Sequence, residues 1–146
     1  ERELTQTIFQ ESSIKLYEAR LDKYKEVWPL LKVIAGYEWR KLEGGKLAKD
    51  SSQNAIEAVQ KMADDLTDAA YSSLGLLMSE ESRTHLTNLR RSCGAFKRNK
   101  ITSQELMRHA HWFKHSLRAD LYIPNTSIEN EEFRKYTEAI NELLQS

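Results

Sequence analysis

A histidine-rich segment in the C-terminal half carries the residues best suited to chemistry. Residues 109–115 are HAHWFKH, in which His111 and His115 have the four-residue spacing that lets two imidazoles bind one ion from a helical face. Both point away from the apolar stripe of their helix, and the sequence has neither a Glu-x-x-His pair nor a HExxH motif. We therefore expect no metal or cofactor site, with His111 and His115 as weak candidates at most.

Positive charge is concentrated in one segment of a chain whose net charge is zero. Residues 83–118 contain nine basic residues and one acidic residue, a net of +8, whereas residues 1–82 and 119–146 each have a net of −4. Such a cluster can dock an acidic protein, a lipid surface or a nucleic-acid backbone. The residues expected to bind an anionic partner are Arg90, Arg91, Lys97, Arg98, Arg108, Trp112 and Arg118.

Two alternatives to this docking surface stay open. Asp64, Asp65 and Asp68, together with the acidic last helix, could neutralise the basic residues inside the protein. Trp112 lies off the apolar stripe, so it is either an exposed contact residue or is covered by the first or last helix. The sequence does not choose between these outcomes.

No pattern for catalysis stands out elsewhere in the chain. Cys93 lies on an apolar stripe with no histidine three or four residues away, which predicts a small buried side chain. A lone cysteine cannot form an internal disulfide, and no run of about 18 apolar residues exists. We therefore expect a soluble, non-enzymatic domain in the cytoplasm.

The elements that position these residues are predicted to be helices, because glycine and proline are rare. The first helix is expected over residues 4–39, with a kink or break at Pro29. Its apolar stripe is Ile14, Tyr17, Leu21, Tyr24, Trp28 and Leu31.

Four shorter helices are expected to follow. The second, capped by Asp50 or Ser51, should end near Gly75, with the stripe Ile56, Val59, Ala63, Leu66, Ala70, Ser73 and Leu77. The third should begin after Ser79, bury Leu86, Leu89, Cys93 and Phe96, and end at Asn99 and Lys100. The fourth has a capping box at Thr102 and Glu105 and buries Leu106, Ala110, Phe113, Leu117 and Leu121. The last has a capping box at Thr126 and Glu129 and carries Ile128, Phe133, Tyr136, Ile140 and Leu143.

These elements predict an all-α fold, an antiparallel bundle of about five helices with a long first helix, in one domain over residues 1–146. The chain starts with Glu1 rather than Met, as expected of a fragment of a longer protein. The aromatic stripe of the first helix also makes a homo-oligomer an open alternative.

Three segments carry a resemblance to a group of proteins: YEARLDKYKEVWPLL at 17–31, LGLLMS at 74–79 and LRADL at 117–121. They resemble uncharacterised bacterial helical proteins that often carry an N-terminal transmembrane anchor. The resemblance implies no activity. It implies a membrane tether ahead of Glu1 and hence association with a membrane.

The function expected from the sequence is an interaction or regulatory domain that docks an anionic partner through a basic helical hairpin. Nucleic-acid binding by the same hairpin is the first alternative. A metal-dependent enzyme, with polar ligands inside the bundle, is the second, and few inward positions are polar.

Overall fold

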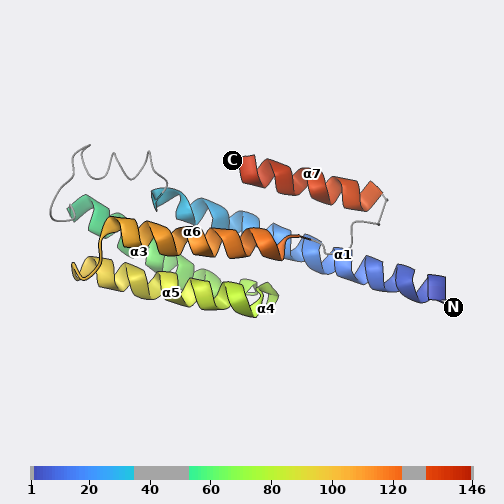
Figure 1. Ribbon diagram of the computed structural model, residues 1–146, viewed down its shortest axis with the longest axis horizontal. Helices are drawn as coiled ribbons and strands as arrows, with labels where there is room; N and C mark the ends of the chain where they lie inside the picture. Colours follow the sequence, from blue (N-terminus) through green and yellow to red (C-terminus); the bar gives the residue numbers. More distant parts are fainter. Residues whose placement is uncertain (1, 35–52, 123–130, 146) are drawn as a thin grey trace.

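The computed structural model describes residues 2–34, 53–122 and 131–145 and shows an all-α bundle, with no strand in these ranges (Figure 1). The long helices are α1 (Arg2–Val27), α3 (Gln53–Ala70), α5 (Glu80–Lys97), α6 (Ser103–Asp120) and α7 (Glu131–Gln145). A one-turn helix, α4 (Leu74–Leu77), and a 3₁₀ helix, η1 (Trp28–Ile34), complete them. The fold class predicted from the sequence is confirmed.

The first helix changes character next to its proline. The α-helical part ends at Val27, and the chain continues as η1 from Trp28 to Ile34. Pro29 has no N–H to donate and its ring clashes with the preceding turn, which breaks the α-helix, whereas in the first turn of η1 its missing N–H has no intrahelical acceptor to lose. The predicted break at Pro29 is confirmed, and the expected extension to Trp39 lies outside the described residues.

The aromatic stripe of α1 and η1 forms part of the core. Ile14, Leu21, Tyr24 and Leu31 are buried, and Tyr17 and Trp28 are half-buried against them. The N-terminal end of α1 extends beyond the other helices, while α7 lies along α1 (Figure 1). The Tyr17 and Tyr136 rings meet edge to face across α1 and α7, with centroids 6.2 Å apart.

The apolar stripe predicted for the second helix is partly wrong. Its Val59 and Leu66 are buried, but Ile56, Ala63 and Ala70 are only half-buried. The sequence offers neighbouring apolar residues at 55–56 and 62–63, so two stripes one residue apart fit the same spacing. Packing against the other helices selects the stripe Ala55, Val59, Met62 and Leu66.

The same helix also ends earlier than predicted. It stops at Ala70 rather than near Gly75, and Ser73 is exposed. The Ser72 hydroxyl donates to the Ala69 carbonyl at 2.6 Å, and the Ser72 N–H donates to the same oxygen. Short hydroxyl side chains that bond nearby backbone offer an alternative to helix continuation. The chain therefore turns, and α4 buries Leu74 instead.

The α5–α6 hairpin follows the sequence prediction closely. The Ser79 hydroxyl accepts a hydrogen bond from the Ser82 N–H as N-cap of α5, and the Thr102 hydroxyl accepts one from the Glu105 N–H as N-cap of α6. Asn99 ends α5 in the left-handed region, with φ of 56°. The apolar residues predicted for both helices are buried. The capping residues expected at 50–51 and at 126–129 lie outside the described residues, as does Ile128.

Candidate functional site

The outward side of α5 carries two exposed arginines. Leu89, Cys93 and Phe96 are buried on its inner side, and Arg91 and Arg98 lie roughly opposite them on the helix. Each guanidinium offers five donors in a planar fork suited to carboxylates and phosphates. Lys97 is also exposed, in the last turn of α5.

Arg90 points elsewhere than its neighbour Arg91. Its Nε donates to the Thr67 hydroxyl of α3 at 3.1 Å, and its guanidinium lies 6.0 Å from the centroid of the Tyr71 ring. It therefore lies half-buried between α3 and α5. Arg90 is part of the predicted set, but it is half-buried against α3, whereas Arg91 is exposed and lines the same groove.

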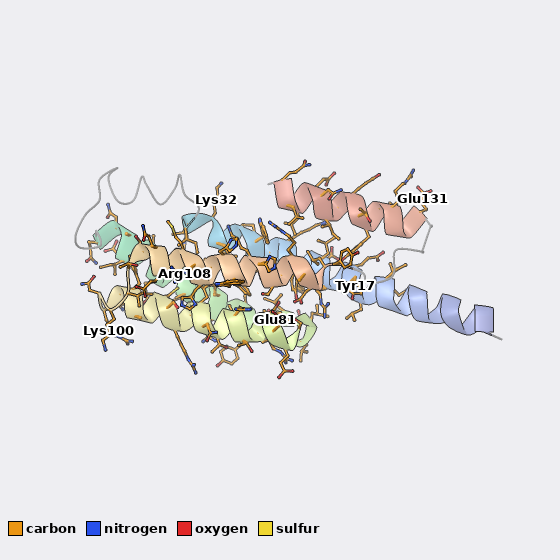
Figure 2. All side chains as sticks on the ribbon, viewed as in Figure 1. Tyr17, Lys32, Glu81, Lys100, Arg108 and Glu131 are labelled. Carbon is orange, nitrogen blue, oxygen red and sulfur yellow. The ribbon has the colours of Figure 1, made fainter. Side chains whose placement is uncertain are left out.

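The outward side of α6 carries Arg108 and Trp112. Arg108 is exposed (Figure 2), and 49% of Trp112 is exposed, which places the indole at the surface rather than under α1 or α7. Together Arg91, Arg98, Arg108 and Trp112 form what we name the hairpin face. Arg118 is exposed too but lies near Lys114, toward η1.

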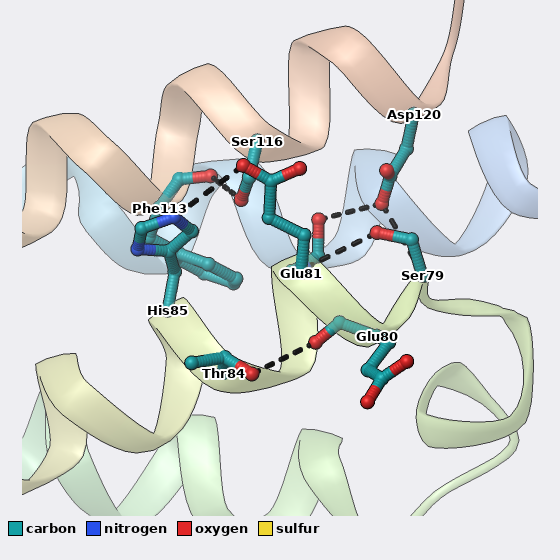
Figure 3. Close-up of polar contacts among 9 residues, drawn as sticks. Ser79, Glu80, Glu81, Thr84, His85, Phe113, Ser116 and Asp120 are labelled. Atoms are coloured by element: carbon teal, nitrogen blue, oxygen red, sulfur yellow. Dashed lines mark hydrogen bonds and ion pairs between the residues drawn. The ribbon is translucent and has the colours of Figure 1, made fainter.

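Three histidines surround the indole on the hairpin face. The His85 ring of α5 is nearly parallel to the Trp112 ring, at 12° and 6.4 Å between centroids. His111 and His115 meet the indole edge to face, at 6.2 and 6.4 Å. His85 also forms an ion pair with Glu81, at 3.8 Å (Figure 3). The result is a continuous group of rings across α5 and α6.

Internal neutralisation of the arginines finds little support. Among the described residues, the ion pairs are Lys23–Glu26, His85–Glu81 and Arg134–Glu131, none of which uses an arginine or lysine of α5 or α6. Asp64 accepts a hydrogen bond from Gln60 of its own helix, at 3.0 Å, although it lines the same groove as Arg90 and Arg91. In the described part, the arginines and lysines of the hairpin thus form no ion pair, although Asp64 borders the groove beside Arg90 and Arg91.

Lys114 is a second basic residue of the hairpin that is half-buried. Its Nζ lies 5.7 Å from the centroid of the half-buried Trp28 ring. Burial, and then the positive charge of Arg118, lower the pKa of Lys114. This contact fastens α6 to η1 and draws Lys114 inward, whereas Arg118, one turn later, is exposed.

The pair His111 and His115 remains a weak candidate for binding a metal ion. The His111 and His115 rings are 6.5 Å apart and exposed, so both could reach one ion. Within the described ranges, no group of three or more histidine, cysteine, aspartate or glutamate side chains is placed to hold a metal. Two imidazoles alone leave most of a metal's coordination to water.

Cys93 lies inside the bundle. It is 2% exposed, and burial raises the pKa of its thiol to about 12. The thiolate is the reactive form of cysteine, and burial in an apolar setting suppresses it. The side chain packs as a small apolar group, in the position that its place on the stripe predicts.

A partly buried polar cluster, which was not predicted from the sequence, joins three parts of the bundle. The Asp120 carboxylate at the end of α6 accepts hydrogen bonds from the Tyr24 hydroxyl of α1 at 2.7 Å and the Ser82 hydroxyl of α5 at 2.6 Å. It also lies 3.4 Å from the Ser79 nitrogen, at the N-terminus of α5 (Figure 3). A helix N-terminus favours a negative charge, so this location suits the carboxylate.

Arg20 completes this cluster, which we name the Asp120 clasp: Arg20, Tyr24, Ser79, Ser82 and Asp120. Its guanidinium donates to the Leu77 carbonyl at 2.8 Å and to the Asp120 carbonyl at 2.9 Å. These carbonyls come at the ends of α4 and α6, where a helix has acceptors to spare. The clasp therefore ties α1 to both helix ends.

The clasp is built as a structural joint rather than an open site. Ser82 is fully buried, and its hydroxyl donates to Asp120. Burial, followed by the hydrogen bond to Asp120, raises the pKa of Tyr24 well above its ordinary range. Each of these groups already has a hydrogen-bond partner inside the protein.

A signal for the clasp is present in the sequence. The three-four stripe of α5 extends back from Leu86 to Ser82, and that of α6 extends from Leu117 to Asp120. A polar residue on a core stripe needs a buried partner. The three segments at 17–31, 74–79 and 117–121, which carry the resemblance described above, also meet at this clasp. His85 was missed because the register between the two helices sets its contact with Trp112.

Comparison with known proteins finds no relative of this chain. No protein-family model matches the chain, and no curated protein or solved structure matches it. None of the described helices is long and apolar enough to cross a membrane. Any functional argument must therefore start from the residues of this chain.

Proposed function

We propose that this domain is a non-enzymatic interaction module that docks an anionic partner on the hairpin face. The observation that carries the proposal is the set of exposed arginines, Arg91, Arg98 and Arg108, which form no ion pair among the described residues, together with the half-exposed Trp112 one turn from Arg108. Arginine and tryptophan are the residue types most enriched where binding energy concentrates.

Electrostatics supports an anionic partner. The segment 83–118 has a net charge of +8 inside a chain of zero net charge, so the field around the hairpin is positive although the whole protein is neutral. Self-repulsion among these arginines is a cost that folding alone does not require. A bound polyanion would relieve it.

The direct test is charge reversal on the hairpin face. The double variant Arg91→Glu/Arg98→Glu should lose binding to polyanions by about tenfold or more at low salt. The probes are labelled single-stranded and duplex oligonucleotides, vesicles containing phosphatidylserine, and a poly-glutamate peptide, each at about 50 and about 200 mM salt.

A matched control separates location from net charge. Lys25→Glu/Lys32→Glu changes the net charge by the same amount, and both lysines are exposed on α1 and η1, outside the α5–α6 hairpin. This control should retain most of the binding. Equal losses in both double variants, or no binding of any probe by the unmodified protein, would overturn the proposal.

A further inference from the structure

The rings around Trp112 narrow down the kind of anion. All four histidines of the chain are at positions 85, 109, 111 and 115, and three of their rings contact the indole. His111 and His115 are exposed, and their rings are within 22° of parallel. An acidic peptide or a lipid headgroup would use the arginines but has no need of four adjoining aromatic rings.

Unpaired nucleobases use both features. Each base has a π face that stacks on Trp, His or Arg, whatever its sequence, while its phosphate attracts arginine. On α5, Arg91 and Arg98 lie two helical turns apart, or about 10 Å along the axis. On α6, Arg108 lies one turn before Trp112. Arg108 therefore places a positive charge one turn from the indole on α6, and Arg91 and Arg98 carry positive charge along the exposed side of α5.

We infer that the partner of the hairpin face is single-stranded nucleic acid, whose bases stack on Trp112 and its neighbouring imidazoles while arginines meet the phosphates. This inference rests on the proposed function, since it names the anion that the arginines dock. A duplex hides its base faces within its own stack, so the ring group contributes to a single strand and not to a duplex.

One acidic side chain is close to the rings and should oppose the strand. Glu81 is largely exposed, at 76% of its side chain, and its carboxylate pairs with His85. Replacing it by glutamine keeps the size and removes the negative charge. Glu81→Gln should therefore bind a single strand several-fold more tightly than the unmodified protein does.

The test measures binding of labelled oligonucleotides of about 20 residues, as a single strand and as a duplex, by fluorescence anisotropy. Trp112→Ala should weaken single-strand binding by about tenfold or more, while Trp112→Phe keeps most of it. Tyr71→Ala is the matched control, because Tyr71 is 83% exposed but lies at the α3–α4 turn. It should bind like the unmodified protein, and circular dichroism checks that each variant folds.

The outcomes separate this inference from the proposed function. Single-strand preference that depends on Trp112 supports both. Arginine-dependent binding of a duplex, of vesicles or of poly-glutamate that is as tight as that of a single strand, or that ignores Trp112→Ala, overturns the single-strand inference and leaves the docking surface standing. Failure of the unmodified protein to bind any probe overturns both.

Discussion

The Asp120 clasp and the hairpin face use similar side chains to opposite ends. Both combine arginine with an aromatic side chain. In the clasp, Arg20 donates to two carbonyls and Tyr24 donates to Asp120, so the polar groups find partners inside the protein. On the hairpin face, Arg91 and Arg98 lie exposed with no ion pair in the described part of the chain.

The difference shows how a structural arginine is told from a recognition arginine. A buried polar group without a partner is costly, so its bonds must be closed within the fold. An exposed guanidinium has water in place of a partner and can exchange it for a ligand. The two regions should therefore respond differently to substitution, and that difference can be measured.

The largest expected effect is at Asp120. Asp120→Ala leaves the Tyr24 and Ser82 hydroxyls without their acceptor and should lower the free energy of unfolding by about 3 kcal/mol. Arg98→Ala, on the hairpin face, should change it by no more than about 0.5 kcal/mol. Urea denaturation followed by circular dichroism measures both. Similar losses of unfolding free energy at the two positions would contradict the distinction between the clasp and the hairpin face.

Two glycine-to-alanine substitutions test the comparison further. The same change should lower the free energy of unfolding at Gly75, beside the clasp, and raise it at Gly94, in α5. A methyl group at Gly75, beside the clasp, would press against the Ala70 carbonyl oxygen, so Gly75→Ala should destabilise by about 2 kcal/mol. Gly94, inside α5, has open space around the added carbon. Gly94→Ala should stabilise by about 1 kcal/mol, since alanine favours the helix. Thermal melts of the two alanine variants measure whether Gly94→Ala is the more stable protein.

Alkaline pH should lower the stability of the protein through its buried thiol and phenol groups. Burial raises the pKa values of Cys93, Tyr24 and Tyr136, so the folded state keeps protons that the unfolded chain has lost. The stabilisation is complete below the ordinary thiol value of 9.0 and is lost as pH rises through the folded values.

Unfolding curves at about pH 8 and about pH 10.5 should therefore show a lower free energy of unfolding at the higher pH. Tyr136→Phe, which removes one of the three groups, should flatten that dependence. An unchanged slope in this variant would contradict the assignment of Tyr136 as a contributor.

How far the sequence predicts this molecule depends on how local the signal is. Caps such as Ser79 and Thr102 act over three residues, and both were predicted from residue type and spacing. The outward location of Arg91 follows from the helical period alone. By contrast, the choice between neighbouring apolar stripes in α3 depends on what packs against it.

The candidate site shows the same limit. Exposure of Trp112 was an open question in the sequence, because a fifth helix could have covered it. Its contact with His85 needs the register of α5 against α6, and the Arg90 bond to Thr67 needs the approach of α3. Such contacts join residues far apart in the chain, and no local pattern encodes them.

The clasp also has a consequence for the order in which the chain folds. The Arg20 guanidinium and the Asp120 carbonyl that it bonds are 100 residues apart in sequence. Contacts of that separation form only after the intervening chain has been ordered, and they slow the search for the native state. During synthesis, the Arg20 bond to Leu77 can form first, and the bonds of α1 to Asp120 must wait until the end of α6 has left the ribosome.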